Sequence, residues 1–302
     1  MVSRKMGAMI KRVLAAIVMI PIAIVTLYVG SPYVEVLAII VGGLLAWEWA
    51  NMLAPTSKTS HYVTAYMMGL AIAIWAYNFE VIIPMILLIS LAVWQIAEKE
   101  KFRKLLTLGV PYIAIGVASL IWMYRSFDPS EGNFDPRYNY SFIMTAWFFL
   151  MVWSMDIGGL IIGCGVRGPK LAPKISPNKT WSGFIGGIML AVSFSIIFMF
   201  VCTNIMEIPF FDFDKFRYIS FSYKPMGVDY EWNINSQMFY AVLAVFVAIL
   251  AQIGDLIESA IKRLAGVKDS SKLIPGHGGV FDRIDGLIFA SAITYLFFIY
   301  IL

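Results

Sequence analysis

The sequence predicts an all-α, polytopic membrane protein with about nine transmembrane helices. Of its 302 residues, 60% are hydrophobic and 14% are charged, whereas soluble globular domains are about 45–50% apolar. Apolar runs also recur along the whole chain at lengths near the roughly 20 residues that a helix needs to cross a bilayer. These two observations together exclude an ordinary soluble domain.

Nine segments meet this length or come close to it. In chain order they cover residues 10–29, 33–53, 62–78, 80–97, 106–125, 141–164, 181–204, 236–262 and 284–302. The third and fourth are short and are separated near Asn78 and Glu80, so the count is expected to hold within one. The first run is longer than the roughly 7–15 apolar residues of a secretory signal peptide, and we expect a retained helix.

Basic residues indicate how the spans are oriented. With the N-terminus inside, the inner segments carry 18 of the 23 Lys and Arg residues, and the two long outer loops carry the other five. Cytoplasmic loops are enriched in Lys and Arg, so we predict a cytoplasmic N-terminus and an outward C-terminus in a cell inner membrane or plasma membrane. The net charge of +4 is too small to indicate a nucleic-acid partner.

One stretch is unusually polar for such a chain. Residues 255–285 hold ten charged residues and a histidine between two apolar segments. Charge near bilayer depth costs a few kcal/mol per group and is usually retained for a function. We therefore expect residues 1–140 to form about five N-terminal transmembrane helices, and residues 141–302 to form a transmembrane catalytic region whose site faces the cytoplasm.

The polar stretch begins on a helical face. Gln252, Asp255, Ser259 and Lys262 recur at a spacing that places them on one side of a helix. They offer an amide, a carboxylate, a hydroxyl and an ammonium group in line. The spacing leaves open a purely structural alternative, in which Asp255 and Lys262 neutralise each other.

The loop that follows is rich in groups that bind phosphate. Gly278 and Gly279 adjoin His277, and glycines let backbone N–H groups approach an anion closely. His277 alone could instead only brace a turn. Basic side chains can make charge-assisted hydrogen bonds to phosphate oxygens, and this stretch supplies Lys262, Arg263, Lys268, Lys272 and Arg283.

Carboxylates at the start of the last apolar segment predict a metal site. Asp282 and Asp285 have i, i+3 spacing there, and with Asp255 they provide the oxygen ligands that Mg²⁺ shares with substrate phosphates. A single histidine without a partner argues against zinc. A second cation beside the Mg²⁺ is an alternative that the sequence leaves open.

A second basic segment, residues 167–183, falls on the same predicted side of the membrane. Its three prolines indicate a shaped loop. Ser176 or Thr180 could cap the helix that follows, whose N-terminus would favour an anion. Lys174 and Lys179 could meet a phosphate, or could simply anchor the loop to anionic lipid head groups.

At this point the residues resemble a known family. The run Ser259-x-x-Lys262-Arg263-x-x-x-x-Lys268-Asp269-x-Ser271-x-x-Ile274-Pro275-x-His277-Gly278-Gly279-Val280-x-Asp282-Arg283-Ile284-Asp285 is similar to the full signature of the phosphatidate cytidylyltransferases, or CDP-diacylglycerol synthases. The loop 171–181 and the helix 252–259 also resemble bacterial members. This motif-level resemblance covers roughly the C-terminal half of the chain.

The resemblance implies that CTP and phosphatidic acid react with Mg²⁺ to give CDP-diacylglycerol and pyrophosphate. It implies a catalytic group of Asp255, Ser259, Lys262, His277 and Asp282, with Asp255, Asp282 and Asp285 on the metal. The substrates would be bound by Lys174, Ser176, Lys179, Thr180, Arg263, Lys268, Lys272, Gly278, Gly279 and Arg283.

Two other functions fit the residues less well. A CTP-dependent lipid kinase would transfer the γ-phosphoryl group to a polyprenol alcohol, with His277 or Asp255 as the base. An ion-coupled transporter would use Asp255 and Asp156 as cation sites, but a charge cluster at the inner mouth beside a glycine-rich loop argues against it. Membrane lipid is an expected partner in each case, and the long apolar helices are compatible with a homodimer.

Overall fold

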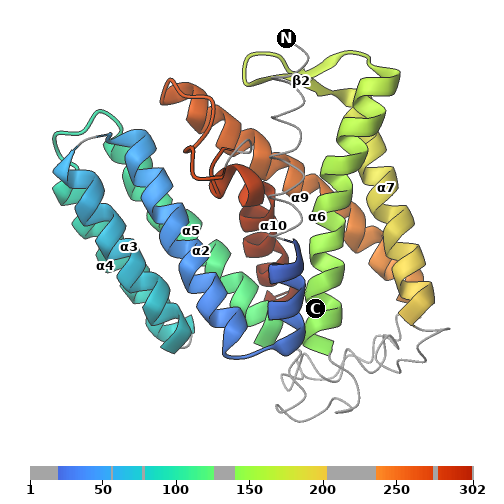
Figure 1. The fold of residues 1–302 in the computed structure, drawn as a ribbon, viewed down its shortest axis with the longest axis horizontal. Helices are drawn as coiled ribbons and strands as arrows, with labels where there is room; N and C mark the ends of the chain where they lie inside the picture. Colours follow the sequence, from blue (N-terminus) through green and yellow to red (C-terminus); the bar gives the residue numbers. More distant parts are fainter. Residues whose placement is uncertain are drawn as a thin grey trace, which may run out of the picture. The chain divides into compact units, whose positions relative to one another are not determined.

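The structure is a computed structural model that describes residues 20–55, 57–76, 79–125, 140–202, 236–274 and 278–300. Within these ranges the chain is mainly helical, with one two-stranded hairpin (Figure 1). The helical class predicted for a multi-pass membrane protein is therefore confirmed. The outward or inward location of each terminus stays a prediction.

The helices follow the apolar segments of the sequence. A short apolar helix covers Ile20–Val29. It is followed by α2 (Tyr33–Leu53), α3 (Lys58–Ala76), α4 (Phe79–Ile96), α5 (Arg103–Arg125), α6 (Tyr140–Val166), β1 (Lys170–Ala172), β2 (Ser176–Thr180), α7 (Trp181–Phe200), α9 (Ser236–Leu264) and α10 (Phe281–Tyr300).

Five of the described helices are long and apolar enough to cross a membrane. They are Tyr33–Leu53, Arg103–Arg125, Ser141–Val166, Trp181–Phe200 and Met238–Leu264. The helix Ile20–Val29 and the apolar part of α4 are shorter. The count of nine spans stays a prediction.

The described helices group into two compact units. The first unit contains Met1–Ile121 and Ile257–Ala292, and the second contains Trp122–Leu256 and Ile293–Leu302. Because the division falls inside α9, this helix contributes to both units. The separation into an N-terminal helical region and a C-terminal catalytic region stays a prediction.

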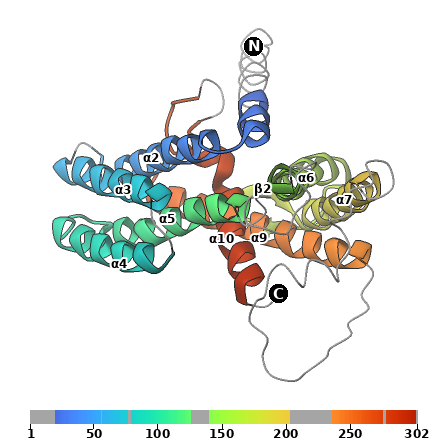
Figure 2. The same cartoon turned by 90° about the horizontal axis from the view of Figure 1, so that it is seen from below.

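In the first unit, α3 lies between α2 and α4 (Figure 2). An aromatic cluster joins α2, α5 and α10: the Trp49 ring lies 5.8 Å from that of Tyr112 and 5.6 Å from that of Phe281. Trp49 also donates a hydrogen bond from Nε1 to the Leu105 carbonyl at 3.1 Å. Trp49 and Phe281 are almost fully buried, so this cluster fixes where α10 begins.

Close contact between α5 and α10 depends on Gly116. A Cβ there would lie 2.4 Å from Ile288 Cγ2 and 2.8 Å from the Ile288 carbonyl oxygen. The Ser291 hydroxyl also donates to the Gly116 carbonyl at 3.0 Å. A small residue thus lets the two backbones approach, as is common between membrane helices.

In the second unit, α6 and α7 pack along glycines. A Cβ on Gly158 would lie 2.9 Å from Gly187 Cα, and one on Gly183 would lie 2.6 Å from the Gly159 carbonyl oxygen. The two helices run side by side in Figure 1, and they make the most extensive contact between elements of this unit.

The predicted loop 167–183 contains a β-hairpin, which its sequence pattern did not indicate. Strands β1 and β2 are antiparallel, with Lys170 opposite Thr180 and Ala172 opposite Ser176. Thr180 then caps α7: its hydroxyl accepts a hydrogen bond from the Gly183 N–H at 3.1 Å. The capping role expected for Ser176 or Thr180 is therefore confirmed for Thr180.

Candidate functional site

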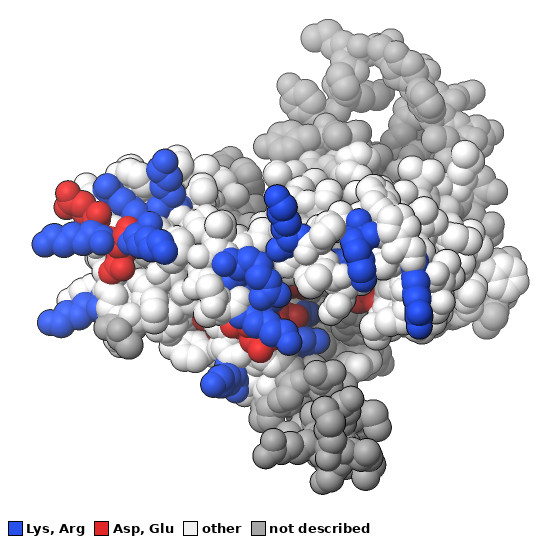
Figure 3. All heavy atoms as spheres, turned by 90° about the horizontal axis from the view of Figure 1, so that it is seen from above, with Lys and Arg blue, Asp and Glu red and all other residues white. Residues whose placement is uncertain are grey.

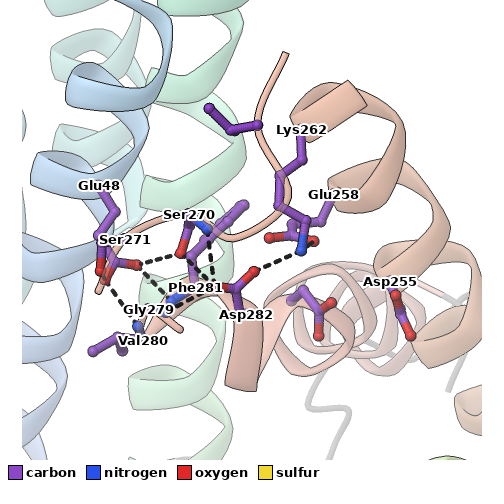
Figure 4. A network of polar contacts seen from close by, with 12 residues as sticks. Glu48, Asp255, Glu258, Lys262, Ser270, Ser271, Gly279, Val280, Phe281 and Asp282 are labelled. Atoms are coloured by element: carbon purple, nitrogen blue, oxygen red, sulfur yellow. Dashed lines mark hydrogen bonds and ion pairs between the residues drawn. The ribbon is translucent and has the colours of Figure 1, made fainter. Parts of the chain in front are cut away.

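A buried ion-pair cluster lies in the first unit, where α9 approaches the start of α10 (Figure 4). Lys262 Nζ lies 2.6 Å from Asp282 Oδ1 and 2.5 Å from Glu258 Oε2. The side chains of Lys262, Asp282 and Glu258 are 10%, 6% and 0% exposed, respectively. We call these three residues the lysine–carboxylate cluster. One ammonium group thus serves two carboxylates that would otherwise repel each other.

The carboxylate of Asp282 accepts hydrogen bonds beyond this ion pair. Its Oδ2 accepts from the Ser270 N–H at 2.9 Å, from the Ser270 hydroxyl at 3.0 Å and from the Gly279 N–H at 2.7 Å. Burial alone would raise the pKa of Asp282, but bonds from Lys262 and from the Gly279 and Ser270 N–H groups outweigh it and lower the pKa. Asp282 is therefore an ionised acceptor.

A second carboxylate, from α2, binds the same loop. Glu48 is fully buried, and its two oxygens accept four hydrogen bonds from residues 270–281 (Figure 4). The donors are the hydroxyls of Ser270 and Ser271 and the N–H groups of Val280 and Phe281. The start of α10 is thus held by a side chain more than 200 residues earlier in the sequence.

Gly278 and Gly279 let the backbone of this loop approach the carboxylates of Asp282 and Glu48 closely. Gly278 has φ +87°, and a Cβ there would lie 2.5 Å from Asp282 Oδ2. A Cβ on Gly279 would lie 2.0 Å from Ser270 Oγ and 2.5 Å from Glu48 Oε1. The sequence predicts that these glycines donate backbone N–H groups to a phosphate. In this structure the Gly279 N–H donates to Asp282 instead.

In the second unit, Lys179 of β2 forms an ion pair with Asp255 of α9. Both side chains are partly exposed, at 21% and 24%. The sequence left open a mutual neutralisation of Asp255 and Lys262. The structure instead pairs Asp255 with Lys179, while Lys262 lies in the lysine–carboxylate cluster. Gln252, one turn before Asp255, is buried.

The predicted polar face of α9 is buried in large part. Ser259 and Lys262 are buried, and Glu258 is fully buried beside them. Asp255 lies in the second unit, and Asp282 and Asp285 lie in the first. Asp285 Oδ1 accepts from the Gly286 N–H of its own helix at 2.7 Å.

The remaining basic candidates are at the surface. Arg263, Lys268, Lys272 and Arg283 are exposed, as is Lys174 in the turn of the hairpin. On the face drawn in Figure 3, basic side chains are more frequent than acidic ones. Ser176 is half-buried and Thr180 is buried. His277 lies outside the described residues.

Sequence reasoning missed the roles of Glu258 and Glu48. For Glu258 a local signal existed, because a glutamate four residues before a lysine forms a pair on a helix. For Glu48 the only signal was a carboxylate inside an otherwise apolar segment, which is unusual enough to indicate a function. Its partners cannot be deduced from local spacing.

The donor chemistry around Lys262 fits a hard divalent cation only in part. Carboxylate oxygens are the ligands that Mg²⁺ prefers, and the buried Oε1 of Glu258 has no hydrogen-bond partner among the described residues. In the described ranges, however, no three His, Cys, Asp or Glu side chains are grouped so that they could hold one ion by themselves. Lys262 Nζ occupies the position between the two carboxylates.

The helices and the buried charged cluster define an integral membrane protein with a polar site on two of its helices. Sequence comparison gives its family: the chain belongs to the cytidylyltransferase family, whose model matches residues 10–301. The match extends well beyond the C-terminal half that carries the motifs, and it includes Glu48.

Individual relatives agree over almost their full length. The chain is 30% identical to a phosphatidate cytidylyltransferase of Haemophilus influenzae, covering 97% of this chain and 99% of that protein. It is 32% identical to one from Brucella suis, over 95% of this chain and 92% of the relative. A third, from Rickettsia conorii, is 27% identical over 96% of this chain and 91% of the relative.

Proposed function

We propose that the protein transfers a cytidylyl group from CTP to phosphatidic acid, producing CDP-diacylglycerol and pyrophosphate. The lysine–carboxylate cluster is the observation that carries the proposal, together with the membership of the family and the names of its relatives. A buried ammonium group shared by two carboxylates, beside a glycine-containing loop, is suited to chemistry between phosphate groups.

The reaction needs charge neutralisation more than it needs a base. A phosphatidate oxygen attacks the α-phosphorus of CTP, and the bond from that phosphorus to the pyrophosphate oxygen breaks. Since the attacking phosphate is already ionised, no proton has to be removed from it. The main barrier is repulsion between two anions, which positioned cations lower. Lys262 is such a cation, and Lys179 is a second one.

The exposed basic residues suit the recognition of a triphosphate. Arg263, Lys268, Lys272 and Arg283 would contact the nucleotide from the surface, where charge-assisted bonds to phosphate form without a desolvation cost to a buried group. Ser176, Lys174 and Lys179 of the hairpin would meet the lipid phosphate. We expect both substrates on the cytoplasmic side, as the distribution of Lys and Arg in the sequence predicts.

Magnesium dependence is part of the proposal. Asp282 and Asp285 are the ligands that the sequence predicts within the first unit, and Asp255 is its candidate within the second. Glu258 is a further candidate, because its Oε1 has no hydrogen-bond partner in the described part of the chain. When bound, the ion would supply positive charge to the substrate phosphates. Glu258 Oε1 would be available to the ion while Lys262 stays paired with Glu258 Oε2 and Asp282 Oδ1.

Labelled CTP tests this proposal and separates it from its rivals. Purified protein in detergent–phosphatidate micelles with Mg²⁺ should incorporate label from the α-phosphate of CTP into lipid, and it should release label from the γ-phosphate as pyrophosphate. Transfer of γ-label to a polyprenol would indicate a kinase instead. Ion uptake into proteoliposomes without any label transfer would indicate a transporter.

A further inference from the structure

We propose that Glu48 is a positioning residue for the transfer reaction. Glu48 binds the chain on both sides of the glycine loop, by which we mean Gly278 and Gly279. It thereby fixes the start of α10, and so the positions of Asp282 and of Lys262, which pairs with Asp282. This inference rests on the function proposed above. Glu48 lies in α2, outside the signature motif, and it does not itself belong to the lysine–carboxylate cluster.

The contacts of Glu48 are with one short region. Oε1 accepts from the Ser271 hydroxyl at 2.6 Å and from the Val280 N–H at 2.9 Å. Oε2 accepts from the Ser270 hydroxyl at 3.0 Å and from the Phe281 N–H at 2.7 Å. Each oxygen therefore binds one side chain before the glycine loop and one backbone group after it.

The burial of Glu48 makes these bonds consequential. A carboxylate removed from water is costly unless hydrogen bonds replace its hydration, and four donors do so here. Val280 and Phe281 lie at the N-terminus of α10, where the first N–H groups have no acceptor within the helix and favour a negative charge. Glu48 thus caps α10 from a different helix.

The bonds of Glu48 are coupled to those of Asp282. Three successive N–H groups, from Gly279, Val280 and Phe281, are divided between the two carboxylates: the first donates to Asp282 and the others to Glu48. The Ser270 hydroxyl lies 3.0 Å from an oxygen of each carboxylate and has one proton to donate. If Ser270 and the backbone of residues 279–281 moved away from Glu48, the hydrogen bonds that Ser270 and Gly279 make to Asp282 would therefore also be disturbed.

The arrangement requires a carboxylate and not only a polar group. In a Glu48→Gln variant, an amide NH₂ would replace one oxygen and face a hydroxyl and a backbone N–H. The hydroxyl can rotate and accept, but the backbone N–H cannot. One N–H at the start of α10 would then lose its acceptor while the side chain keeps its size.

The experiment compares Glu48→Gln with the wild type in the labelled-CTP assay and by hydrogen exchange of the peptides that cover residues 270–285. We expect kcat to fall about 100-fold, since a displacement near 1 Å can have that effect. The KM for CTP should change less than about threefold, because Glu48 is buried away from substrate. Exchange should rise in residues 270–285, with little change in α6 and α7.

The control is Glu35→Gln, which neutralises another buried glutamate of α2. Glu35 lies about 20 Å from Glu48 along the helix, at a rise of 1.5 Å per residue. We therefore expect the kcat of the Glu35→Gln variant to stay within about threefold of the wild-type value. Restoration of activity by Glu48→Asp is not expected, since the shorter side chain cannot reach both backbone groups. Equal loss in Glu35→Gln and Glu48→Gln would overturn the proposal.

A Ser271→Ala variant keeps the proposal testable if Glu48→Gln does not fold. It removes one of the four bonds to Glu48 and the acceptor of the Leu273 N–H, and it leaves the bonds from the Val280 and Phe281 N–H groups. We therefore expect a fall in kcat of about threefold to tenfold, with faster exchange at residues 278–285 beyond the local change at Leu273. Unchanged kcat in whichever variant folds refutes the positioning role. An inactive wild type would refute the proposed function instead, and faster exchange in Glu48→Gln would still report the structural contact.

Discussion

Lys179 of strand β2 donates a hydrogen bond to Asp255 of α9, so the hairpin that precedes α7 is tied to the helix that carries an expected metal ligand. Both side chains are partly exposed, and ion pairs near the surface contribute only about 0–1 kcal/mol. An incoming phosphate can therefore compete for Lys179 at little cost. The pair would hold the lysine in place until substrate binds.

Replacing Lys179 should impair the use of substrate more than it impairs folding. In Lys179→Ala we expect kcat/KM to fall about 10- to 100-fold, the equivalent of one charge-assisted hydrogen bond of about 1.5–3 kcal/mol. Steady-state kinetics with phosphatidate and CTP varied separately would identify the substrate concerned. Lys170→Ala, at an exposed lysine of the same hairpin, is the matched control, and an equal loss there would indicate a general effect of positive charge.

Removing the charge of Asp282 should abolish most turnover. Asp282→Asn keeps the size of the side chain, but its amide group would face either the Lys262 ammonium or the N–H groups of Ser270 and Gly279. We expect activity to fall about 100- to 1,000-fold, the range for loss of one well-placed electrostatic group, and addition of Mg²⁺ should not restore it.

The Asp282→Asn protein should still accumulate in the membrane, because the substitution changes no apolar span and Lys262 retains Glu258 as its partner. Membrane yield and activity over a Mg²⁺ titration measure the two effects separately. Glu98→Gln, at an exposed position, serves as the charge-loss control. Wild-type activity in Asp282→Asn would remove Asp282 from the metal role.

A methyl group at Gly279 should displace the loop from both carboxylates. The added Cβ would overlap Ser270 Oγ and the oxygens of Glu48, so we expect Gly279→Ala to lose at least about tenfold in activity and to unfold at a lower temperature. The control is Gly69→Ala in α3, where no atom lies within 4 Å of the added Cβ. There alanine should be neutral, or stabilise the helix by about 0.5–1 kcal/mol.

Loss of the cap at Thr180 should mainly affect stability. Thr180→Ala removes the hydroxyl that accepts from the Gly183 N–H, and such losses cost about 1 kcal/mol. Thr180→Ser should retain most of the stability because it keeps the hydroxyl. Thermal unfolding in detergent compares the two variants. Equal melting temperatures for Thr180→Ala and the wild type would mean that the cap contributes nothing measurable.

Much of the fold could be predicted because apolar length determines where helices form in a membrane protein. The expected segments 33–53 and 106–125 closely match α2 and α5. The boundary of α3 was less accurate: the helix begins at Lys58, before its apolar part, where the Ser57 hydroxyl accepts from the Thr59 N–H. A polar first turn has no hydrophobic signal.

The site could be predicted in part. The signature motif contains both Lys262 and Asp282, and the structure joins them. It did not indicate Glu48, because a hydrogen bond between residues 48 and 281 depends on how α2 and α10 pack and not on local spacing. The hairpin was also missed, since its three prolines indicated a shaped loop without strands, although Pro177 lies within β2.

The capping of α10 by Glu48 limits how the signature motif can be isolated. A fragment that starts near residue 140 would retain every residue of the signature. It would lack Glu48, however, which accepts hydrogen bonds from the N–H groups of Val280 and Phe281 at the N-terminus of α10. Transplanting the motif into another scaffold, or expressing it as an autonomous half-protein, would thus require a substitute acid on a neighbouring helix.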